Sequence, residues 1–211
     1  MGEQPRLAKP RGRYRLKARA DGMVRTRQRI TEAAVELHGS IGPAATTMSA
    51  VAERAGVTRA TLYRHFPDEA TLFAACSREW LAAHPRPDVA AWSAIVEPRR
   101  RLQLALHEMY AYYAATEGML ANLLRDSAAL PEPIARNLAS YPGQMLKVLD
   151  VGWPTGGDRR VRRAAIVHAV AFETWASLSR AGLSDGEAAE LMAALVNEAA
   201  IPPGVSAVAG R

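Results

Sequence analysis

Residues 47–65 have the pattern of two short helices separated by a tight turn. Apolar residues recur at the spacing of one helix face from Met48 to Ala55, and Gly56 ends that pattern. Thr58 can then cap a second short helix, which fills the rest of the segment. Two short helices joined by a glycine-containing turn form a helix-turn-helix, which needs further helices to bury its apolar sides. The segment therefore predicts a small all-helical unit.

The residues on either side supply those further helices. An apolar stripe at helical spacing begins at Ile30, and Gly42-Pro43 ends it. Thr47 is a suitable N-cap for the helix that follows. After Pro67, Asp68 can cap a fourth helix that reaches about residue 83.

The rest of the chain also reads as helical, without sustained strand alternation or an internal repeat. The sequence thus predicts an all-α protein with an N-terminal three-helix helix-turn-helix domain and a C-terminal helical domain. In the second domain, helices are expected near 89–95, 98–116, 118–128, 133–149, 158–181 and 185–199. The expected divisions are a flexible basic arm (1–22), the helix-turn-helix domain (23–67), a connecting helix (68–84), the C-terminal domain (85–201) and a tail (202–211).

The positive charge is concentrated at the N-terminal end. The formal charge of the chain is +6, whereas residues 1–29 hold ten Lys/Arg against two acids, a net of +8. The remaining residues therefore sum to −2, and a polyanion would be met at the N-terminal end. The arm binds DNA in one interpretation and only keeps the protein soluble in the other.

Several classes of protein are disfavoured. The single cysteine, Cys76, excludes an intramolecular disulfide and is expected to be a core residue. The five histidines have no metal-ligand spacing, and neither a nucleophile elbow nor a phosphate-binding glycine loop is present. We therefore expect no catalytic residues, metal or cofactor, and no enzyme. Without a signal sequence or an apolar membrane span, the expected location is the cytoplasm.

The second short helix carries hydrogen-bond donors on its exposed side. A B-DNA major groove accepts one α-helix, and arginine suits guanine while the threonine methyl suits thymine. Leu62 and Phe66 can anchor the opposite face to the core. The candidate DNA-binding residues in and beside this helix are Thr58, Arg59, Thr61, Tyr63, Arg64 and His65. The alternative is a solvated surface helix.

The pattern A-E-R-A-G-V-T-x-x-T-L-Y-x-H-F-P-D resembles the DNA-binding end of TetR-type transcriptional regulators. The match extends from about Arg25 to Leu72, less than a quarter of the chain. The resemblance implies a helical ligand-binding and dimerisation domain after the DNA-binding domain. It also implies a phosphate contact at Thr47, base or phosphate contacts at the start of the second short helix, and backbone contacts from Tyr63 and His65. Glu69 departs from the family, which often has a lysine there that contacts phosphate.

The C-terminal region offers candidates for an effector site. Its apolar stripes read first as helix core, but a subset of residues can line an apolar cavity with a few polar groups. The candidates are Leu106, His107, Tyr110, Tyr113, Leu123, Arg125, Met145 and Trp175. The effector itself is expected to be small and apolar.

The last two predicted helices, 158–181 and 185–199, are apolar over most of their surface. Paired with their symmetry mates, they would form a homodimer interface, as the family resemblance implies; a monomer core is the alternative. The expected function is a ligand-responsive repressor that binds a near-palindromic operator as a dimer. The rival function is a helical small-molecule-binding protein or enzyme that does not bind an operator, and an activator differs only in its output.

Overall fold

The computed structural model describes residues 11–154 and 158–199 of the 211-residue chain. All regular structure within these ranges is helical, which confirms the predicted all-α class. The chain divides into two compact units, residues 1–80 and 81–211, and the division falls inside α4 (Glu69–Ala83). Within the described ranges, every helix is too short or too polar to cross a bilayer.

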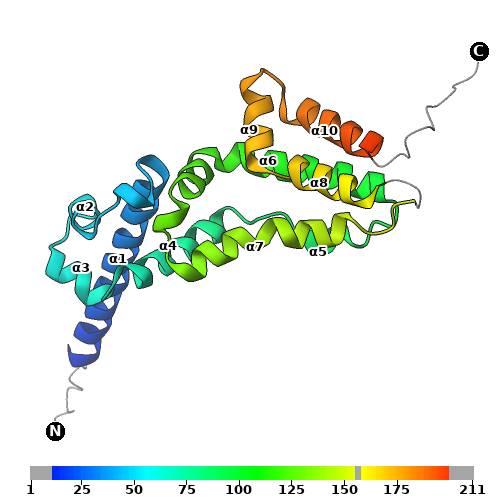
Figure 1. Cartoon of the computed structure of the whole chain (residues 1–211). Coiled ribbons are helices and arrows are strands. Elements are labelled where there is room, and N and C mark those ends of the chain that lie inside the picture. The colour runs from blue at the N-terminus through cyan, green and yellow to red at the C-terminus, as the bar shows by residue number, and fades with distance from the viewer. Residues whose placement is uncertain (1–10, 155–157, 200–211) are drawn as a thin grey trace, which may run out of the picture. The chain divides into compact units, whose positions relative to one another are not determined.

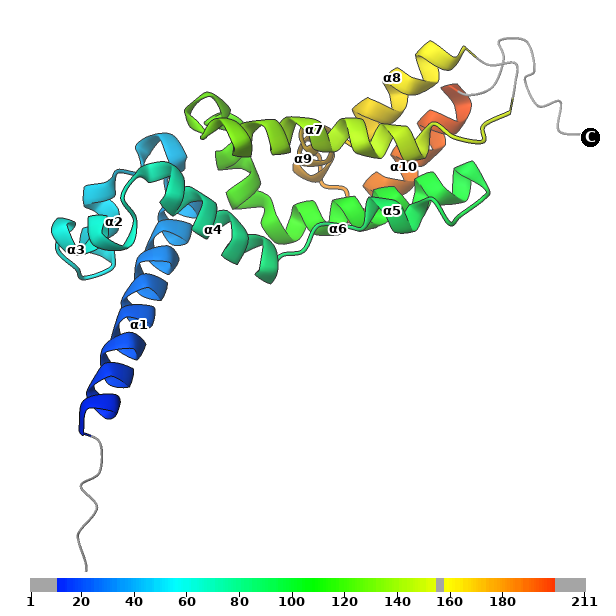
Figure 2. The same ribbon diagram turned by 90° about the horizontal axis from the view of Figure 1, so that it is seen from below.

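The first unit is a three-helix domain followed by the start of α4. Its elements are α1 (Arg11–Ser40), the 3₁₀ turn η1 (Pro43–Ala45), α2 (Met48–Arg54) and α3 (Arg59–His65). Helices α2 and α3 lie beside the C-terminal half of α1 (Figures 1 and 2). The predicted stripes meet in one core, which includes Ile30, Ala34, Val51, Ala52, Leu62, Phe66, Leu72 and Cys76.

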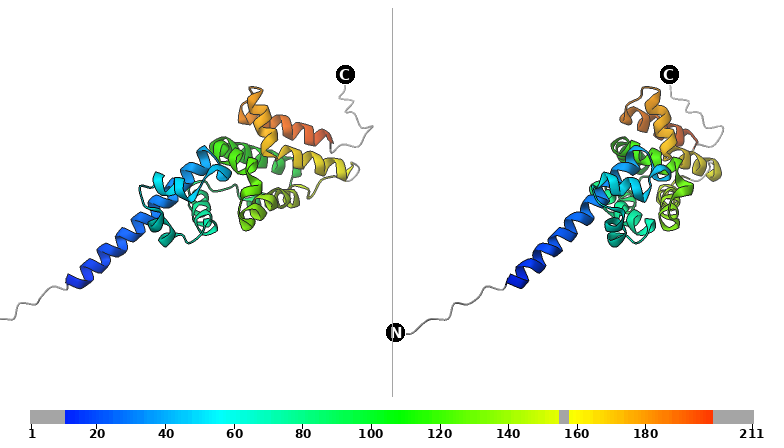
Figure 3. Two further views of the ribbon diagram at one scale, coloured as in Figure 1. Left: turned by 60° about the vertical axis from the view of Figure 1, so that its left-hand side comes forward. Right: turned by 90° about the vertical axis from the view of Figure 1, so that its left-hand side faces the viewer.

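Helix α1 begins at Arg11, so the expectation of a flexible arm over residues 1–22 is wrong for residues 11–22. Arginine, lysine, alanine and leucine, which favour a helix, make up most of residues 11–22. Thirty helical residues span about 45 Å. Figure 3 shows the N-terminal part of α1 extending past α2 and α3. The predicted tail and the first ten residues of the predicted arm lie outside the described residues.

The second unit is a helical bundle. Its elements after α4 are α5 (Val89–Trp92), α6 (Pro98–Arg125), the 3₁₀ turn η2 (Ser127–Ala129), α7 (Glu132–Leu149), α8 (Arg159–Ala169), α9 (Phe172–Arg180) and α10 (Asp185–Ala199). Helix α10 packs along α6 and α8, as Figure 1 shows. The largest fully buried side chains here are Trp92, Tyr110 and Trp175. The indole N–H of Trp175 donates to Asp185 (2.8 Å), so the buried ring keeps a partner for its polar group.

Two predicted helix boundaries in this unit are wrong. The helices expected at 98–116 and 118–128 are the single helix α6, since Gly118 does not interrupt it. The single helix expected at 158–181 is divided into α8 and α9 at Val170–Ala171. The hydroxyls of Tyr110 and Tyr113 donate to the carbonyls of Ala169 (2.7 Å) and Val170 (2.6 Å). In a continuous helix these two carbonyls would accept from backbone N–H groups one turn later. The tyrosine hydroxyls supply the hydrogen bonds instead, so the helix can break here without glycine or proline.

Candidate nucleic-acid interface and ligand pocket

A threonine caps the start of each short helix, and one glycine lies in the turn between α2 and α3. The Thr47 hydroxyl accepts from the Ala50 N–H (3.1 Å), and the Thr58 hydroxyl accepts from the Thr61 N–H (3.2 Å). Gly56 has φ +61°, a conformation that other residues rarely adopt. The predicted boundaries of both helices are therefore fixed by local chemistry.

Helix α3 buries one side and exposes the other. Leu62 and Phe66 are fully buried, as predicted. The predicted DNA-binding residues share the opposite, accessible side: Thr58, Arg59, Tyr63 and Arg64 are exposed, and Thr61 and His65 are half-buried. Thr47 is exposed at the start of α2. The structure thus brings six of the seven candidates together on and next to α3.

The two arginines of α3 are available for an anionic partner. Among the described residues, neither Arg59 nor Arg64 forms an ion pair, and the Arg59 guanidinium lies 5.9 Å from the centre of the Tyr63 ring. The Thr58 hydroxyl is in contrast occupied as a cap and also lies 3.0 Å from the Thr61 hydroxyl. We therefore expect the arginines, rather than Thr58, to carry most of the attraction to phosphates.

His65 lies half-buried on this surface. Its partial burial, followed by the positive charges of Arg64 and Arg27, lowers the pKa of the imidazole below its ordinary value. In the free protein the imidazole therefore carries a positive charge less often than an ordinary histidine does, and its N–H group can donate a hydrogen bond to a phosphate.

Two arginines of α1 position the helix-turn-helix, and sequence reasoning missed this role. Arg27 donates to the carbonyl of His65 (2.6 Å) and lies over the Phe66 ring at 4.0 Å. Arg29 donates to the carbonyls of Ala55 and Gly56, the latter at 3.3 Å. Each guanidinium therefore satisfies backbone acceptors at the C-terminal end of α2 or α3, where positive charge is favourable.

This geometry agrees with the comparison to known families. Residues 30–76 match the family model described as bacterial regulatory proteins, tetR family. These residues form a TetR-type DNA-binding domain. No curated protein matches the sequence.

Solved structures share the TetR-type fold over most of this chain. A TetR-like transcriptional regulator from Rhodococcus sp. RHA1 has a TM-score of 0.62 and 20% identity, covering 82% of this chain and 94% of that one. NalD from Pseudomonas aeruginosa, the secondary repressor of the MexAB-OprM multidrug efflux pump, has a TM-score of 0.58 and 20% identity, covering 85% and 97%. At these identities the likeness establishes the fold alone.

The TetR-type domain departs from the expected pattern at α4. Glu69 is exposed at the first position of that helix, and Asp68 precedes it as the cap, accepting from the Thr71 N–H (2.7 Å). Two carboxylates at a helix N-terminus suit the helix dipole but repel phosphate. A DNA interface on this domain would therefore have to rely on α3 and on the basic residues of α1.

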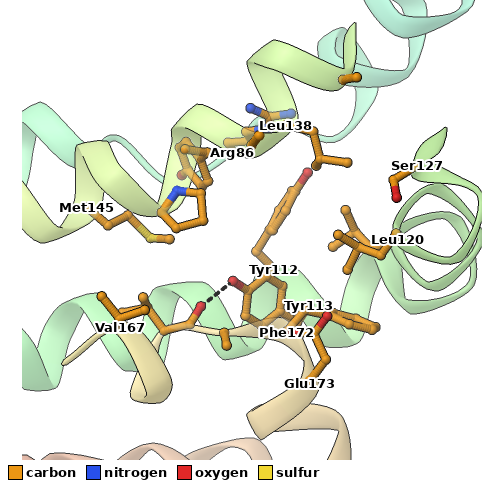
Figure 4. A pocket seen from close by; sticks show the side chains of 17 residues that line it. Arg86, Tyr112, Tyr113, Leu120, Ser127, Leu138, Met145, Val167, Phe172 and Glu173 are labelled. Carbon is orange, nitrogen blue, oxygen red and sulfur yellow. Dashed lines mark hydrogen bonds between the residues drawn. The ribbon is translucent and has the colours of Figure 1, made fainter. Parts of the chain in front are cut away.

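The second unit contains a pocket of about 350 Å³, near the lower end of the usual range for ligand sites. Figure 4 shows its walls, which come from α6, α7, the α8–α9 break and the start of α9. Of the predicted ligand residues, Tyr113 and Met145 line it. The pocket lining does not include Leu106, His107, Tyr110, Leu123, Arg125 or Trp175. Leu106, Tyr110 and Trp175 are core residues instead, and Arg125 pairs with Asp126.

The residues that sequence reasoning missed give the pocket its character. Tyr112, Tyr141 and Phe172 add aromatic surface, and Arg86 and Glu173 add charged groups. Tyr112 directly precedes Tyr113 in the sequence, but the spacing of apolar residues does not identify which of several apolar helix faces encloses a cavity. Tyr113 is buried, and burial raises the pKa of its hydroxyl above the ordinary value, so the hydroxyl stays protonated.

The described residues contain no group of histidine, cysteine and acidic side chains that suits a metal ion. Cys76 is buried in the core of the first unit, as predicted. Its burial, followed by the charge of Glu79, raises the pKa of the thiol to about 12. A thiol that stays protonated at neutral pH is a poor nucleophile.

Proposed function

We propose that this protein is a ligand-responsive transcriptional repressor that binds a near-palindromic operator as a homodimer in the cytoplasm. The observation that carries the proposal is the accessible side of α3, where two arginines that form no ion pair within the described part of the chain lie with Thr61, Tyr63 and His65 in a TetR-type domain. A helix of this kind enters one major groove, and base contacts near its start give sequence preference. Repression, rather than activation, is proposed because NalD, which shares the fold, is a repressor.

The dimer is proposed to form through α8, α9 and α10. Val161 on α8 and Leu191 and Leu195 on α10 are each more than two-fifths exposed in the single chain. Large apolar side chains gathered on helices at one end of the chain are typical of an interface. An isologous dimer would cover them and present two copies of α3 to adjacent major grooves.

Ligand response is proposed to act through α4. Leu72, Phe73 and Cys76 bury this helix in the first unit, and its last residues belong to the second. A ligand in the pocket releases DNA only if it binds one arrangement of the two units better than the other. Coupling energies of this kind are about 1–3 kcal/mol.

A selection of bound fragments from genomic DNA, followed by gel shifts on the DNA beside the gene, tests the proposal. We expect an inverted repeat whose half-sites are about one helical turn or somewhat more apart. Binding of all fragments with equal affinity would contradict operator recognition and favour the rival small-molecule-binding function.

Arg59→Ala is expected to weaken binding to the selected operator by about 1–3 kcal/mol and to relax base preference at one position of each half-site. The reason is the loss of a donor suited to guanine near the start of α3. The measurement is a gel-shift titration on operator variants. An equal loss on unrelated DNA would instead assign Arg59 to phosphate contact.

Lys17→Ala with Arg19→Ala is expected to reduce the slope of log K against log salt by about one for each phosphate that the protein no longer neutralises. Both side chains are exposed near the start of α1. Fluorescence anisotropy at several salt concentrations measures the slope. If the slope does not change, this part of α1 serves solubility and not DNA binding.

A further inference from the structure

The break between α8 and α9 is largely confined to one backbone torsion. Val170, the residue after α8, has φ −85° and ψ 1°, on the border of the helical region. Ala171 has a helical φ of −74° but an extended ψ of 140°, and α9 begins directly after it. Alanine favours a helix more than any other residue. Rotation of ψ at Ala171 would therefore bring α8 and α9 close to one continuous helix.

Side-chain hydroxyls hold three consecutive carbonyls on the α8 side of the break. The Thr174 hydroxyl donates to the His168 carbonyl (2.6 Å). The hydroxyls of Tyr110 and Tyr113 hold the next two carbonyls. In a continuous helix, the backbone N–H groups of residues 172–174 would take these places. The same three acceptors thus have two alternative sets of donors, one for the broken form and one for the continuous form.

The α9 side of the break has no comparable support. Ala171 is at the N-cap position of α9, and no described side chain caps the first N–H groups of this helix. A helix N-terminus ordinarily gains stability from such a cap. The broken form therefore lacks a stabilising contact that the continuous form does not need, which brings the free energies of the two forms closer together.

The break and one of its three hydroxyl donors line the ligand pocket. Residues 170–172 and Tyr113 belong to the lining. Tyr110 and Thr174 do not. Figure 4 shows the bond from Tyr113 as a dashed line at the edge of the cavity. Because a tyrosine hydroxyl has one hydrogen to donate, a ligand that accepts it takes it from the carbonyl at the break.

We propose that Ala171 is a hinge and that Tyr113 is its trigger: an apolar ligand with an acceptor oxygen draws the Tyr113 hydroxyl away from Val170, and α8 and α9 join into one helix. The inference rests on the proposed ligand response and names its mechanism. The number of hydrogen bonds is conserved, because the Thr174 N–H replaces Tyr113 as the donor to Val170. A ligand without an acceptor fills the pocket but leaves the helix broken.

A change at the hinge reaches the helices proposed to form the dimer. The indole N–H of Trp175 on α9 donates to Asp185 at the start of α10 (2.8 Å). Helix α10 also packs against α8. Joining α8 and α9 redirects α9 and, through Trp175, the start of α10, whose Leu191 and Leu195 are exposed. A ligand in the pocket can therefore alter the proposed interface without touching it.

Hydrogen exchange of the Thr174 backbone amide in the full-length protein, followed by mass spectrometry, tests the hinge. Tyr113→Phe removes the donor to Val170 and keeps the ring, so a continuous helix becomes the way to satisfy that carbonyl. Exchange is expected to slow about fivefold, the effect of one hydrogen bond. Tyr112→Phe is the matched control, because its ring lines the same pocket, and it should leave exchange unchanged. Equal exchange in wild type and Tyr113→Phe would overturn the proposal.

Phe172→Pro locks the broken form. Proline is tolerated at the first position of a helix and favours an extended residue before it, as Ala171 is here. It also removes an N–H group that the continuous helix uses. Combined with Tyr113→Phe, it should restore wild-type exchange at Thr174, whereas Phe172→Ala, which removes the same ring, should not. Slow exchange that survives Phe172→Pro would contradict the hinge. Thermal unfolding verifies that each variant folds.

Benzophenone and diphenylmethane test the trigger, since they differ only in a carbonyl group against a methylene group. Both are expected to raise the melting temperature of the full-length protein, which shows that they bind. Only benzophenone should slow exchange at Thr174, about fivefold at saturation, and it should cause no further slowing in Tyr113→Phe. Absence of benzophenone binding, or equal slowing by the two compounds, would refute the role of Tyr113.

Gel shifts with the operator separate this inference from the proposed function. If benzophenone slows exchange at Thr174 and also releases DNA, both stand. If it slows exchange in the expected manner but operator affinity does not change, the hinge stands and the ligand-responsive function fails.

Discussion

Asp150→Asn is expected to lower the free energy of unfolding of the second unit by about 3 kcal/mol. The Asp150 side chain is only 3% exposed and contacts three arginines of α8, Arg159 (3.0 Å), Arg162 (3.2 Å) and Arg163 (2.8 Å). Arg162 is itself buried, so an asparagine would leave it without its charged partner. The position follows the last turn of α7, where the helix dipole disfavours a carboxylate, so the arginines must hold the charge there.

Urea unfolding followed by tryptophan fluorescence measures this loss, because the Trp153 ring lies 5.7 Å from the Arg162 guanidinium. Glu132→Gln is the matched control. It removes a single ion pair, to Arg136, in which the Glu132 and Arg136 side chains are 80% and 72% exposed. Its expected effect is below about 0.5 kcal/mol. Equal effects of the two variants would show that burial of Asp150 does not matter.

The same carboxylate predicts a dependence on pH. Burial acts to raise the pKa of Asp150, but the hydrogen bonds from Arg163, Arg159 and Arg162 outweigh it and hold the pKa below the ordinary value of 3.8. A carboxyl group with a lowered pKa in the folded state contributes stability above its unfolded pKa and loses it as the pH falls. The stability difference between wild type and Asp150→Asn should therefore shrink below about pH 4.

The helix-turn-helix could be predicted closely because its signals are local. Thr47, Gly56 and Thr58 each act on backbone groups within a few residues, and the structure places α2 and α3 within a residue or two of the expected positions. The accessible side of α3 followed directly from the burial of Leu62 and Phe66. Local caps and short apolar repeats are visible in one sequence without any knowledge of tertiary contacts.

The break between α8 and α9 could not be predicted because its cause is distant in sequence. Residues 166–173 contain neither glycine nor proline, and the carbonyls at the break are satisfied by Tyr110 and Tyr113 from α6, 59 and 57 residues earlier. Only the folded chain brings those hydroxyls to the break. Val170 and Ala171 at this break line the pocket, so the position of that wall could not be predicted from the sequence either.

The roles of Arg27 and Arg29 were missed for a different reason. Both belong to residues 1–29, the positively charged end of the chain where a polyanion was expected to bind, and charge alone does not distinguish a phosphate contact from a bond to a backbone carbonyl. In the structure each reaches across the first unit to α2 or α3. Fewer of the arginine and lysine side chains in residues 1–29 are therefore available to contact DNA than their number in the sequence indicates.

Ala60→Glu is expected to reduce operator affinity at least a hundredfold, a larger functional effect than that of Arg59→Ala. Ala60 is exposed at the second position of α3, between Arg59 and Thr61. A carboxylate there would stand at the start of the proposed groove-entering helix, and a like charge facing DNA phosphates costs several kcal/mol. Fluorescence anisotropy with the selected operator measures the affinity.

The same substitution is expected to leave the first unit folded or slightly more stable. An acid in the first turn of a helix is stabilising by about 0.3–1 kcal/mol, and the exposed alanine side chain contributes nothing to the core. Ala60→Gln is the matched control, because glutamine has the size of glutamate without its charge. A small loss for glutamine and a large one for glutamate would identify charge as the cause. If both variants bind the operator as wild type does, α3 does not face DNA, and the proposed function loses the observation that carries it.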